Sequence, residues 1–257
     1  MNRRALLIGV EIAVPVAVFA ALWVWTAGEP AYYFPPLSDV LQTFSETWLF
    51  ERVGSDVVPS MQRLFLGYFI AVAVGVGGGV VLGMSPVLRR VASPIVEFLR
   101  AIPAPALLPF ALLVLGVGNN SKVFVIAFVC VWPILLNAVD GVSGVDPTLT
   151  DTGRVYRIAA RDRLRHVVLP AAAPQIFAGM RTSLSLALIL MVISEMVAST
   201  NGIGYFVLQS QRTFAIPEMW SGIMLLGILG YTLNGAFVLL ERRVLRWHRG
   251  ARASALS

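Results

Sequence analysis

The sequence predicts an all-α fold, a polytopic membrane bundle of about six transmembrane helices with both termini on the cytoplasmic side. Two features of the composition carry this prediction: 57% of the 257 residues are hydrophobic and only 13% are charged. The mean hydropathy of +0.78 agrees with them. Soluble domains carry about 25% charged residues, so a soluble domain of ordinary size is excluded.

Six apolar segments are long enough to cross a bilayer, since a crossing needs about 20 mostly apolar residues. They cover residues 5–27, 57–84, 95–117, 123–139, 176–199 and 219–240. The first follows a basic start, as a signal peptide does, but it is longer than a signal sequence and lacks a small-residue cleavage site. We therefore expect it to remain as the first helix.

Basic residues favour a cytoplasmic position for both termini, because Lys and Arg in short loops mark the cytoplasmic side. With the N-terminus inside, the outer loops hold only Arg52, Lys122 and Arg212 among the basic residues assigned to loops. The net charge of +6 needs no nucleic acid. Anionic lipid of the inner leaflet is a sufficient partner.

The segment after the first span has apolar residues near helical spacing. They are Val40, Leu41, Phe44, Trp48 and Leu49. Residues 37–52 therefore form either an amphipathic helix along the outer surface or an outer loop packed on the bundle. We divide the chain into residues 1–55 with the first helix and this segment, a core at 56–247, and a cytoplasmic tail at 248–257.

The second span has a small residue at every fourth position, a spacing that lets another helix approach closely in lipid. These residues are Gly67, Ala71, Gly75, Gly79 and Gly83. Either static packing or a surface along which helices shift during transport explains this ridge.

Prolines interrupt the third span at Pro103, Pro105 and Pro109. Each interior proline removes a backbone donor and frees a carbonyl, which a membrane tolerates only where protein or water satisfies it. The segment is therefore expected to face the bundle interior or a cavity, with a kinked structural helix as the alternative. Arg100 and Pro103 are candidates for a translocation path or gate.

The fifth span contains Arg181 and Glu195, which are 14 residues apart and therefore share a helix face about 21 Å apart along the axis. A carboxylate inside the hydrocarbon costs a few kcal/mol, so Glu195 should face protein or water. It is either a path or gate residue, grouped here with Met191 one turn earlier, or a clamp between helices.

Residues 140–174 form the only cytoplasmic loop large enough for an element of its own. We predict a short helix at 150–164, capped by Thr150 or Asp151 and crowded with arginine on one face. Taken alone, such a helix could lie on anionic lipid.

The loop resembles the EAA loop of ABC importer permeases. Asp151-Thr152-Gly153 is followed after three residues by Arg157, and after nine more by Val167, with Leu169-Pro170 beyond. Short motifs in the same order across about residues 56–247 resemble the sulfonate, taurine and nitrate branch of that family. They include 60–64, 100–103, 116–122, 168–181, 195–196, 202–205 and 240–247.

The resemblance implies a permease that forms the path for a small solute, a sulfonate, nitrate, bicarbonate or similar anion, or a cofactor precursor. It implies cytoplasmic ABC ATPase subunits that grip the loop, a second permease copy or a related permease, and an extracytoplasmic solute-binding protein. The chain departs from the family pattern at Arg157, which replaces the loop glycine. Arginine resists the turn that glycine permits, so the helix should run on through 157 or turn elsewhere.

No enzyme is expected. The chain lacks a Gly-x-x-x-x-Gly-Lys-Ser/Thr phosphate loop, so ATP and Mg²⁺ should be bound by the partner ATPase. Gly141-Val142-Ser143-Gly144 matches an intramembrane protease string, but the two histidines, His166 and His248, lie in arginine-rich cytoplasmic sequence. Neither they nor Cys130 belong to a set with metal-ligand spacing. An ion-coupled carrier or channel without an ATPase remains the alternative function.

Overall fold

The computed structural model describes residues 13–14, 16–17, 20–26, 28 and 33–247, and this part of the chain is helical. The long helices are α3 (Val58–Met84), α6 (Asn119–Ser143), α9 (Leu169–Ala198) and α11 (Ile216–Val244). The shorter ones are α2 (Leu37–Glu46), α4 (Pro86–Arg100), α5 (Ala104–Leu115), α7 (Pro147–Val155), α8 (Ala160–Arg163) and α10 (Ile203–Arg212). The predicted all-α class is confirmed.

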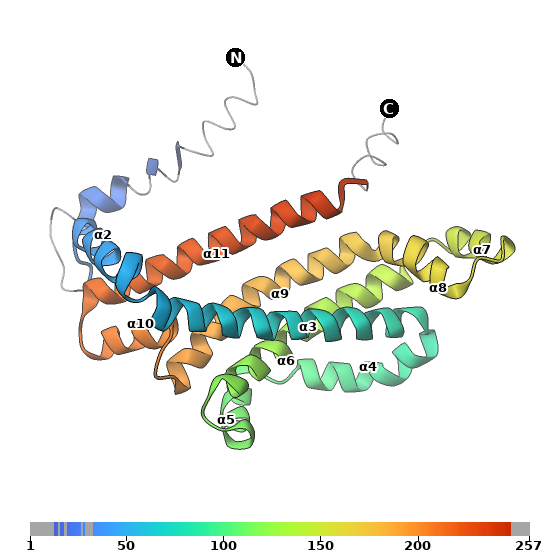
Figure 1. The fold of residues 1–257 in the computed structure, drawn as a ribbon, viewed down its shortest axis with the longest axis horizontal. Helices are drawn as coiled ribbons and strands as arrows, with labels where there is room; N and C mark the ends of the chain where they lie inside the picture. The colour runs from blue at the N-terminus through green and yellow to red at the C-terminus, as the bar shows by residue number, and fades with distance from the viewer. Residues whose placement is uncertain (1–12, 15, 18–19, 27, 29–32, 248–257) are drawn as a thin grey trace, which may run out of the picture.

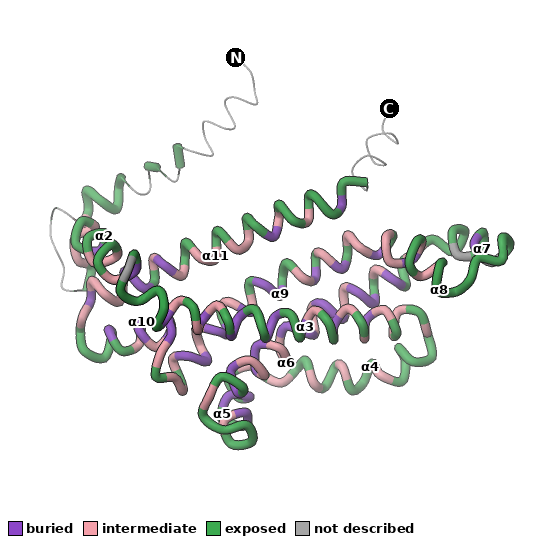
Figure 2. The backbone as a smooth tube through the Cα atoms, in the orientation of Figure 1, coloured by how far each residue is buried: buried purple, intermediate pink, exposed green. Residues whose placement is uncertain are grey.

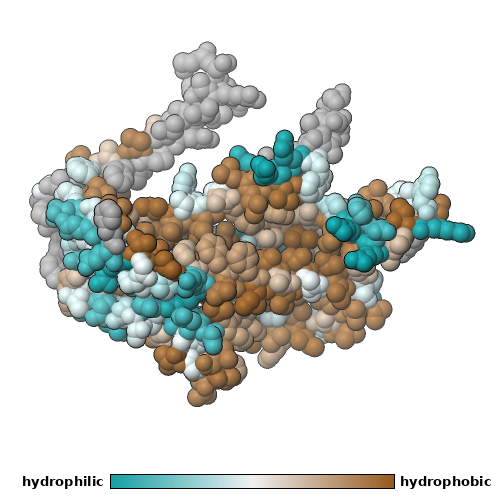
Figure 3. Space-filling model, viewed as in Figure 1, coloured by the Kyte–Doolittle hydropathy of each residue, from teal (hydrophilic) through white to brown (hydrophobic). Residues whose placement is uncertain are grey.

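The long helices run along the longest axis of the molecule, with α10 near one end and α7 at the other (Figure 1). On the face seen in Figure 3, hydrophobic residues predominate in the middle of the molecule, and hydrophilic residues gather toward its two ends. Among the described residues four helices are long and apolar enough to cross a membrane, or up to five when the bent pair α4–α5 is taken as one span. The span predicted at 5–27 lies mostly outside the described residues.

The core consists of α3, α6 and α9, which pack side by side. The small residues of the ridge lie against α6, since a Cβ atom on Gly67 would be 2.7 Å from Cβ of Ile126. The same holds further along the helix, where a Cβ on Gly83 would be 2.7 Å from Cβ of Val142. No side chain fits between the two backbones at these positions.

The third predicted span is two helices that meet at 89°. Pro103 is the extended residue just before α5. At this position no helical hydrogen bond requires a backbone N–H, so the proline costs no stability there. The two halves of this segment differ, because α5 faces the bundle interior with Leu107, Leu108 and Ala111, whereas α4 buries no residue within this chain and does not face that interior. Figure 2 shows α4 as exposed and half-buried backbone along its whole length.

The amphipathic segment packs on the bundle. Helix α2 lies against α11, and Val40 is buried there. Beyond α2, two π-helical turns, Thr47–Glu51 and Val53–Val57, lead into α3. Trp48 is buried in the first of them and donates its indole N–H to Ser221 Oγ at 3.1 Å. The structure combines the two alternatives for residues 37–52, since the segment is helical, as in the first, and packs on the bundle, as in the second.

Candidate functional site

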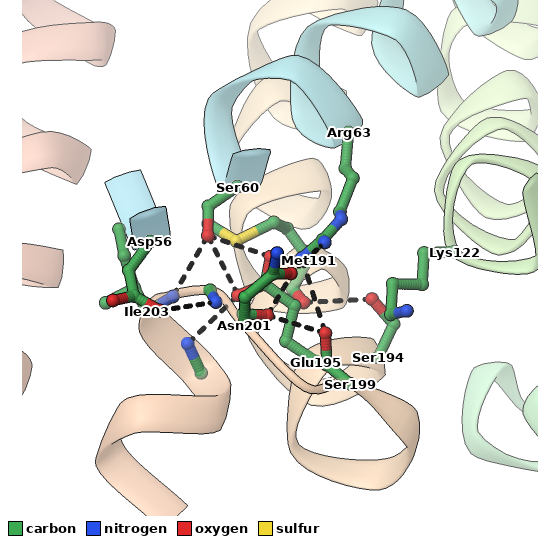
Figure 4. Close-up of polar contacts among 12 residues, drawn as sticks. Asp56, Ser60, Arg63, Lys122, Met191, Ser194, Glu195, Ser199, Asn201 and Ile203 are labelled. Atoms are coloured by element: carbon green, nitrogen blue, oxygen red, sulfur yellow. Dashed lines mark hydrogen bonds and ion pairs between the residues drawn. The ribbon is translucent and has the colours of Figure 1, made fainter. Parts of the chain in front are cut away.

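A buried polar cluster joins α3, α9 and α10 at one end of the molecule (Figure 4). Glu195 on α9 has no exposed surface, and Arg63 Nη1 on α3 lies 2.6 Å from its Oε1. The hydroxyl of Ser60 lies 2.8 Å from the same oxygen and 2.9 Å from Oε2. A buried charge is tolerated only when paired and hydrogen-bonded, and Glu195 meets both conditions.

The other groups of the Arg63 guanidinium are also occupied. Its Nε donates to Asn119 Oδ1 at 2.8 Å, on α6. Nη1 also donates to the carbonyl of Asn201 at 3.1 Å, and Nη2 donates to the side chain of Asn201. One side chain therefore connects three long helices and the turn between α9 and α10. We call Asp56, Ser60, Arg63, Glu195 and Asn201 the clamp.

The clamp also caps α10. Helix N-termini present unpaired N–H groups and favour negative charge. Asp56 accepts a hydrogen bond from the N–H of Gly202 at 2.8 Å, and Glu195 accepts one from Gly204 at 3.0 Å. Ser60 Oγ accepts the N–H of Ile203 at 3.0 Å. The first turn of α10 is thus held by residues from other elements.

Gly202 is required at this turn by its conformation and its surroundings. Its φ of +114° is a backbone conformation that L side chains rarely adopt. A Cβ atom there would overlap the Glu195 carboxyl group. The turn can therefore bring the backbone onto the carboxylate only because position 202 has no side chain.

Sequence reasoning placed Glu195 inside protein but did not find its partners. Arg63 lies six residues inside the span predicted at 57–84, so an intramembrane arginine and an intramembrane glutamate were both visible. Opposite charges within two spans would have suggested the pair. Asp56 was placed in an outer loop, yet it is 3% exposed. Lys122, also placed there, lies in the first turn of α6 and is 3% exposed.

The four path candidates are not brought together. Met191 is fully buried in the core, one turn before Glu195. Arg100 and Pro103 lie at the exposed bend between α4 and α5, where Arg100 Nη2 is 3.1 Å from Glu97 Oε2. Arg181 and Glu195 both lie on the single helix α9, as predicted, but their surroundings differ. Arg181 is exposed, and its Nε donates to Asn234 Oδ1 of α11 at 3.1 Å.

The loop at 140–174 lies at the other end of the molecule from the clamp. The single helix predicted at 150–164 is wrong, because α7 ends at Val155 and α8 begins at Ala160. The predicted caps are wrong too, since α7 begins earlier, at Pro147. Asp146 Oδ1 accepts the N–H of Thr148 at 2.8 Å, and this hydrogen bond lowers the pKa of Asp146.

The turn between α7 and α8 is centred on Arg157. Its φ is +53°, so this arginine adopts the left-handed conformation that glycine favours. The N–H of Ile158 closes the turn onto the carbonyl of Gly153 at 2.9 Å. The expectation that the helix runs through 157 or turns elsewhere is therefore wrong, because the backbone makes the turn and arginine bears its strain.

The remaining loop candidates divide between the surface and the packed side of the loop. Asp151, Thr152 and Arg157 are exposed, whereas Gly153 is buried, with Arg163 Cδ 3.1 Å from where a Cβ atom would be. The Leu169-Pro170 pair does not interrupt the helix. A π-helical turn at Leu164–Val168 and helical torsions at Val168 carry the chain from α8 directly into α9. Val167, Leu169 and Pro170 are half-buried along it.

The side chains of the clamp and of the loop at 140–174 are suited to binding and packing. Within the described ranges no three His, Cys, Asp or Glu side chains are grouped as metal ligands would be. Cys130 is buried in the core, where its Sγ lies 3.3 Å from the carbonyl of Ser183.

Residues 71–246 match the model of a family described as binding-protein-dependent transport system inner membrane component. The putative aliphatic sulfonates transport permease protein SsuC of Bacillus subtilis is 29% identical over 234 residues, 90% of this chain and 85% of that protein. The taurine transport system permease protein TauC of Escherichia coli is 28% identical over 246 residues, covering 91% and 88%. The nitrate import permease protein NrtB of Synechococcus elongatus is 30% identical over 185 residues, covering 71% and 66%.

Solved structures have a similar fold. An inward-facing form of the MetNI methionine ABC transporter superposes with a TM-score of 0.66 at 22% identity, over 74% of this chain and 94% of the other. An amino acid ABC transporter solved with histidines has a TM-score of 0.58 at 16% identity, over 82% and 96%. At these identities the likeness concerns the fold.

Proposed function

Because the chain belongs to the family of binding-protein-dependent transport system inner membrane components, we propose that it moves a small anionic solute through the membrane in response to ATP hydrolysis on its partner. The chain is the permease subunit of an ABC importer and a multi-pass protein of the plasma membrane. It works with an ATPase and with a substrate-binding protein. Membership of this family disfavours an ion-coupled carrier without an ATPase.

The observation that carries the coupling proposal is the continuity of α8, the π-helical turn and α9. These segments form one helical run from Ala160 to Ala198, 39 residues long and therefore about 58 Å in length. It begins in the loop at 140–174 and carries Glu195 of the clamp near its far end. The π-helical turn and Pro174 lie near the loop end of this run, so a regular α-helix from Pro174 to Glu195 can transmit a displacement of the loop to the clamp.

In this proposal the exposed face of α7 and the turn at Arg157 dock on the ATPase, which binds ATP and Mg²⁺. The loop end therefore faces the cytoplasm, and the clamp end faces the substrate-binding protein. Val155 and Tyr156 support docking, because they are 79% and 76% exposed at the tip of the loop. Apolar side chains this exposed beside a basic surface are typical of a protein contact.

A second permease, identical or related, completes the path. The support comes from α4, which exposes a strip of apolar side chains together with the ion pair of Arg100 and Glu97. Lipid suits the apolar strip but not the charges, which need water or protein within a membrane.

The anionic solute is supported by the names of relatives, which refer to aliphatic sulfonates, taurine and nitrate. Each of these solutes carries a sulfonate or nitrate group. Purifying the partner substrate-binding protein and identifying its bound solute by mass spectrometry tests this class. A solute without a sulfonate, nitrate or similar anionic group would contradict it.

Site-specific photo-crosslinking tests the docking and the orientation together. A benzoylphenylalanine at Tyr156 should crosslink the ATPase, whereas the same residue at Phe214 should crosslink the substrate-binding protein. Phe214 is 59% exposed in the turn between α10 and α11, at the clamp end. Crosslinks with the two partners exchanged would reverse the orientation, and no ATPase crosslink from position 156 would refute docking there.

A further inference from the structure

A groove between α9 and α11 has a cavity volume of about 710 Å³, within the range of sites that hold small molecules. Helix α11 runs beside α9 there (Figure 1). The lining includes Arg181, Thr182 and Ser185 of α9 and Asn234 of α11, with leucines and an isoleucine around them. Arg181 is the only charged residue among the described residues of the lining, so the groove has a positive potential.

The polar groups of the groove are donors. Arg181 is exposed and uses its Nε to bind Asn234 Oδ1 at 3.1 Å. This hydrogen bond places the carbonyl of Asn234 toward Arg181, which leaves the NH₂ of the amide as a donor. Thr182 is the exception, because its hydroxyl donates its one proton to the carbonyl of Ala178 at 3.1 Å. Ser185, one helical turn beyond Arg181, adds a hydroxyl on the same face.

Donors of this kind around one arginine fit an oxyanion group such as a sulfonate, a nitrate or a phosphate. The arginine lies within a membrane-spanning helix, where an exposed cation faces water or protein rather than lipid tails. The apolar lining beside it suits the short carbon chain of an alkanesulfonate. The same chemistry would also hold the phosphate of an anionic lipid, because arginine side chains reach toward headgroups.

We propose that this groove lies in the translocation path and holds the anionic group of the solute, with Arg181, Ser185 and Asn234 as its contacts. The inference rests on the proposed function and assigns a place within this chain to the solute. None of the four residues first considered for the path lines the groove.

Thiol accessibility in the assembled importer tests the proposal. The chain's one cysteine is replaced first (Cys130→Ser), and Ser185→Cys then reports on the groove. Reaction rates are measured with sulfonatoethyl methanethiosulfonate, itself a small alkanesulfonate, and with its trimethylammonioethyl counterpart. The matched control is Val74→Cys, on an apolar face of α3 and 56% exposed.

The thiol of the Ser185→Cys variant should react with both reagents and faster with the sulfonate, whereas the thiol of the Val74→Cys variant should react with neither. Adding Arg181→Gln should reduce the ratio of sulfonate rate to cation rate on the order of tenfold, since a unit charge about one turn away is removed. The ratio corrects for any change in thiol acidity. An unreactive thiol at position 185, or a ratio that Arg181→Gln does not alter, overturns the proposal.

Repeating the measurement in nanodiscs distinguishes a lipid in the groove from the solute. Solute in the groove predicts that any change in rate on adding phosphatidylglycerol comes from the surface charge of the membrane and is therefore the same with and without Arg181→Gln. Protection of the thiol at position 185 by phosphatidylglycerol that disappears with Arg181→Gln would assign the groove to lipid and overturn the solute site. Neither outcome alters the solute identified on the binding protein, so this site can fail while the proposed function stands.

Discussion

At the clamp end of α9 the charges are buried and paired, whereas at the loop end they are exposed. Arg63 is 3% exposed and makes hydrogen bonds to α6, α9 and the turn before α10. The loop at 140–174 has more arginines, yet Arg157, Arg161 and Arg165 are all exposed. Charge therefore serves a different purpose at each end of this membrane protein. The buried pair at the clamp end fixes helices relative to one another, and the exposed basic surface at the loop end remains free for a partner.

Removing the carboxylate of the clamp should have the largest effect. Glu195→Gln leaves Arg63 as a buried charge without its counterion, which costs about 3–5 kcal/mol. We expect a large fall in the melting temperature of the purified complex in detergent, measured by intrinsic fluorescence.

The matched control is Glu97→Gln, which breaks an ion pair whose side chains are 45% and 61% exposed and should cost at most about 1 kcal/mol. Replacing both clamp partners, in Arg63→Met with Glu195→Met, should recover part of the loss. Equal effects of Glu195→Gln and Glu97→Gln would show that burial does not distinguish the two pairs.

Gly202→Ala tests the turn that brings α10 to the clamp. The variant combines a left-handed backbone with overlap on Glu195, and we expect a loss of at least about 2 kcal/mol in unfolding free energy. Gly227→Ala is the control, because a Cβ atom there meets nothing within 4 Å. It lies inside α11 and should stabilise by up to about 1 kcal/mol. A harmless Gly202→Ala would contradict the described turn.

Gly79→Ala tests the close packing of α3 against α6. A Cβ atom at 79 would overlap Ala138 of α6, and overpacking of this kind costs about 1–2 kcal/mol. Gly77→Ala, on the open side of the same helix, meets nothing within 4 Å and should be neutral or slightly stabilising. Thermal unfolding followed by intrinsic fluorescence compares the two variants. Similar changes in stability for both would place the contact surface elsewhere.

Arg157→Gly should have the smallest effect and the opposite sign. Glycine removes the cost of the left-handed conformation at φ +53°, so stability should rise by about 1 kcal/mol. Stimulation of ATPase activity by the loaded binding protein should be preserved or improved. Arg157→Ala removes the charge but keeps the strained backbone, so it separates the two contributions. A sharp loss of coupling in both variants would mean that the arginine itself contacts the ATPase.

The order of the long helices follows from the sequence because lipid requires long apolar stretches. Their predicted number is not reproduced in full, since the described residues contain four candidate spans, or five with the bent pair, where six were predicted. The predicted span at 57–84 lies within the candidate span Val53–Met84. The predicted span at 176–199 lies within Ala160–Ala198 except for its last residue. The ridge at Gly67 to Gly83 is also visible in the sequence, since its period of four needs no partner to be recognised. The order of the family motifs likewise pointed to the family that the comparisons show.

The clamp could not be derived in the same way, because it depends on which helices are neighbours. Glu195 and Arg63 are 132 positions apart, and no periodicity connects them. The turn at Arg157 was missed for a different reason. Local propensity argues against arginine in a left-handed turn, but the segments on both sides fix the direction of the chain there. The groove at Arg181 needed the relative position of α9 and α11.

The capping of α10 by other helices has a consequence for the order of assembly. A helix of ten residues is marginal on its own, and α10 has no side-chain cap within its own sequence. Its first N–H groups are bound by Asp56, Ser60 and Glu195, which come from the region before α3, from α3 and from α9. During biosynthesis α10 can therefore form its capped first turn only after these two transmembrane helices have associated. Its formation is thus a late step that depends on correct insertion of the chain.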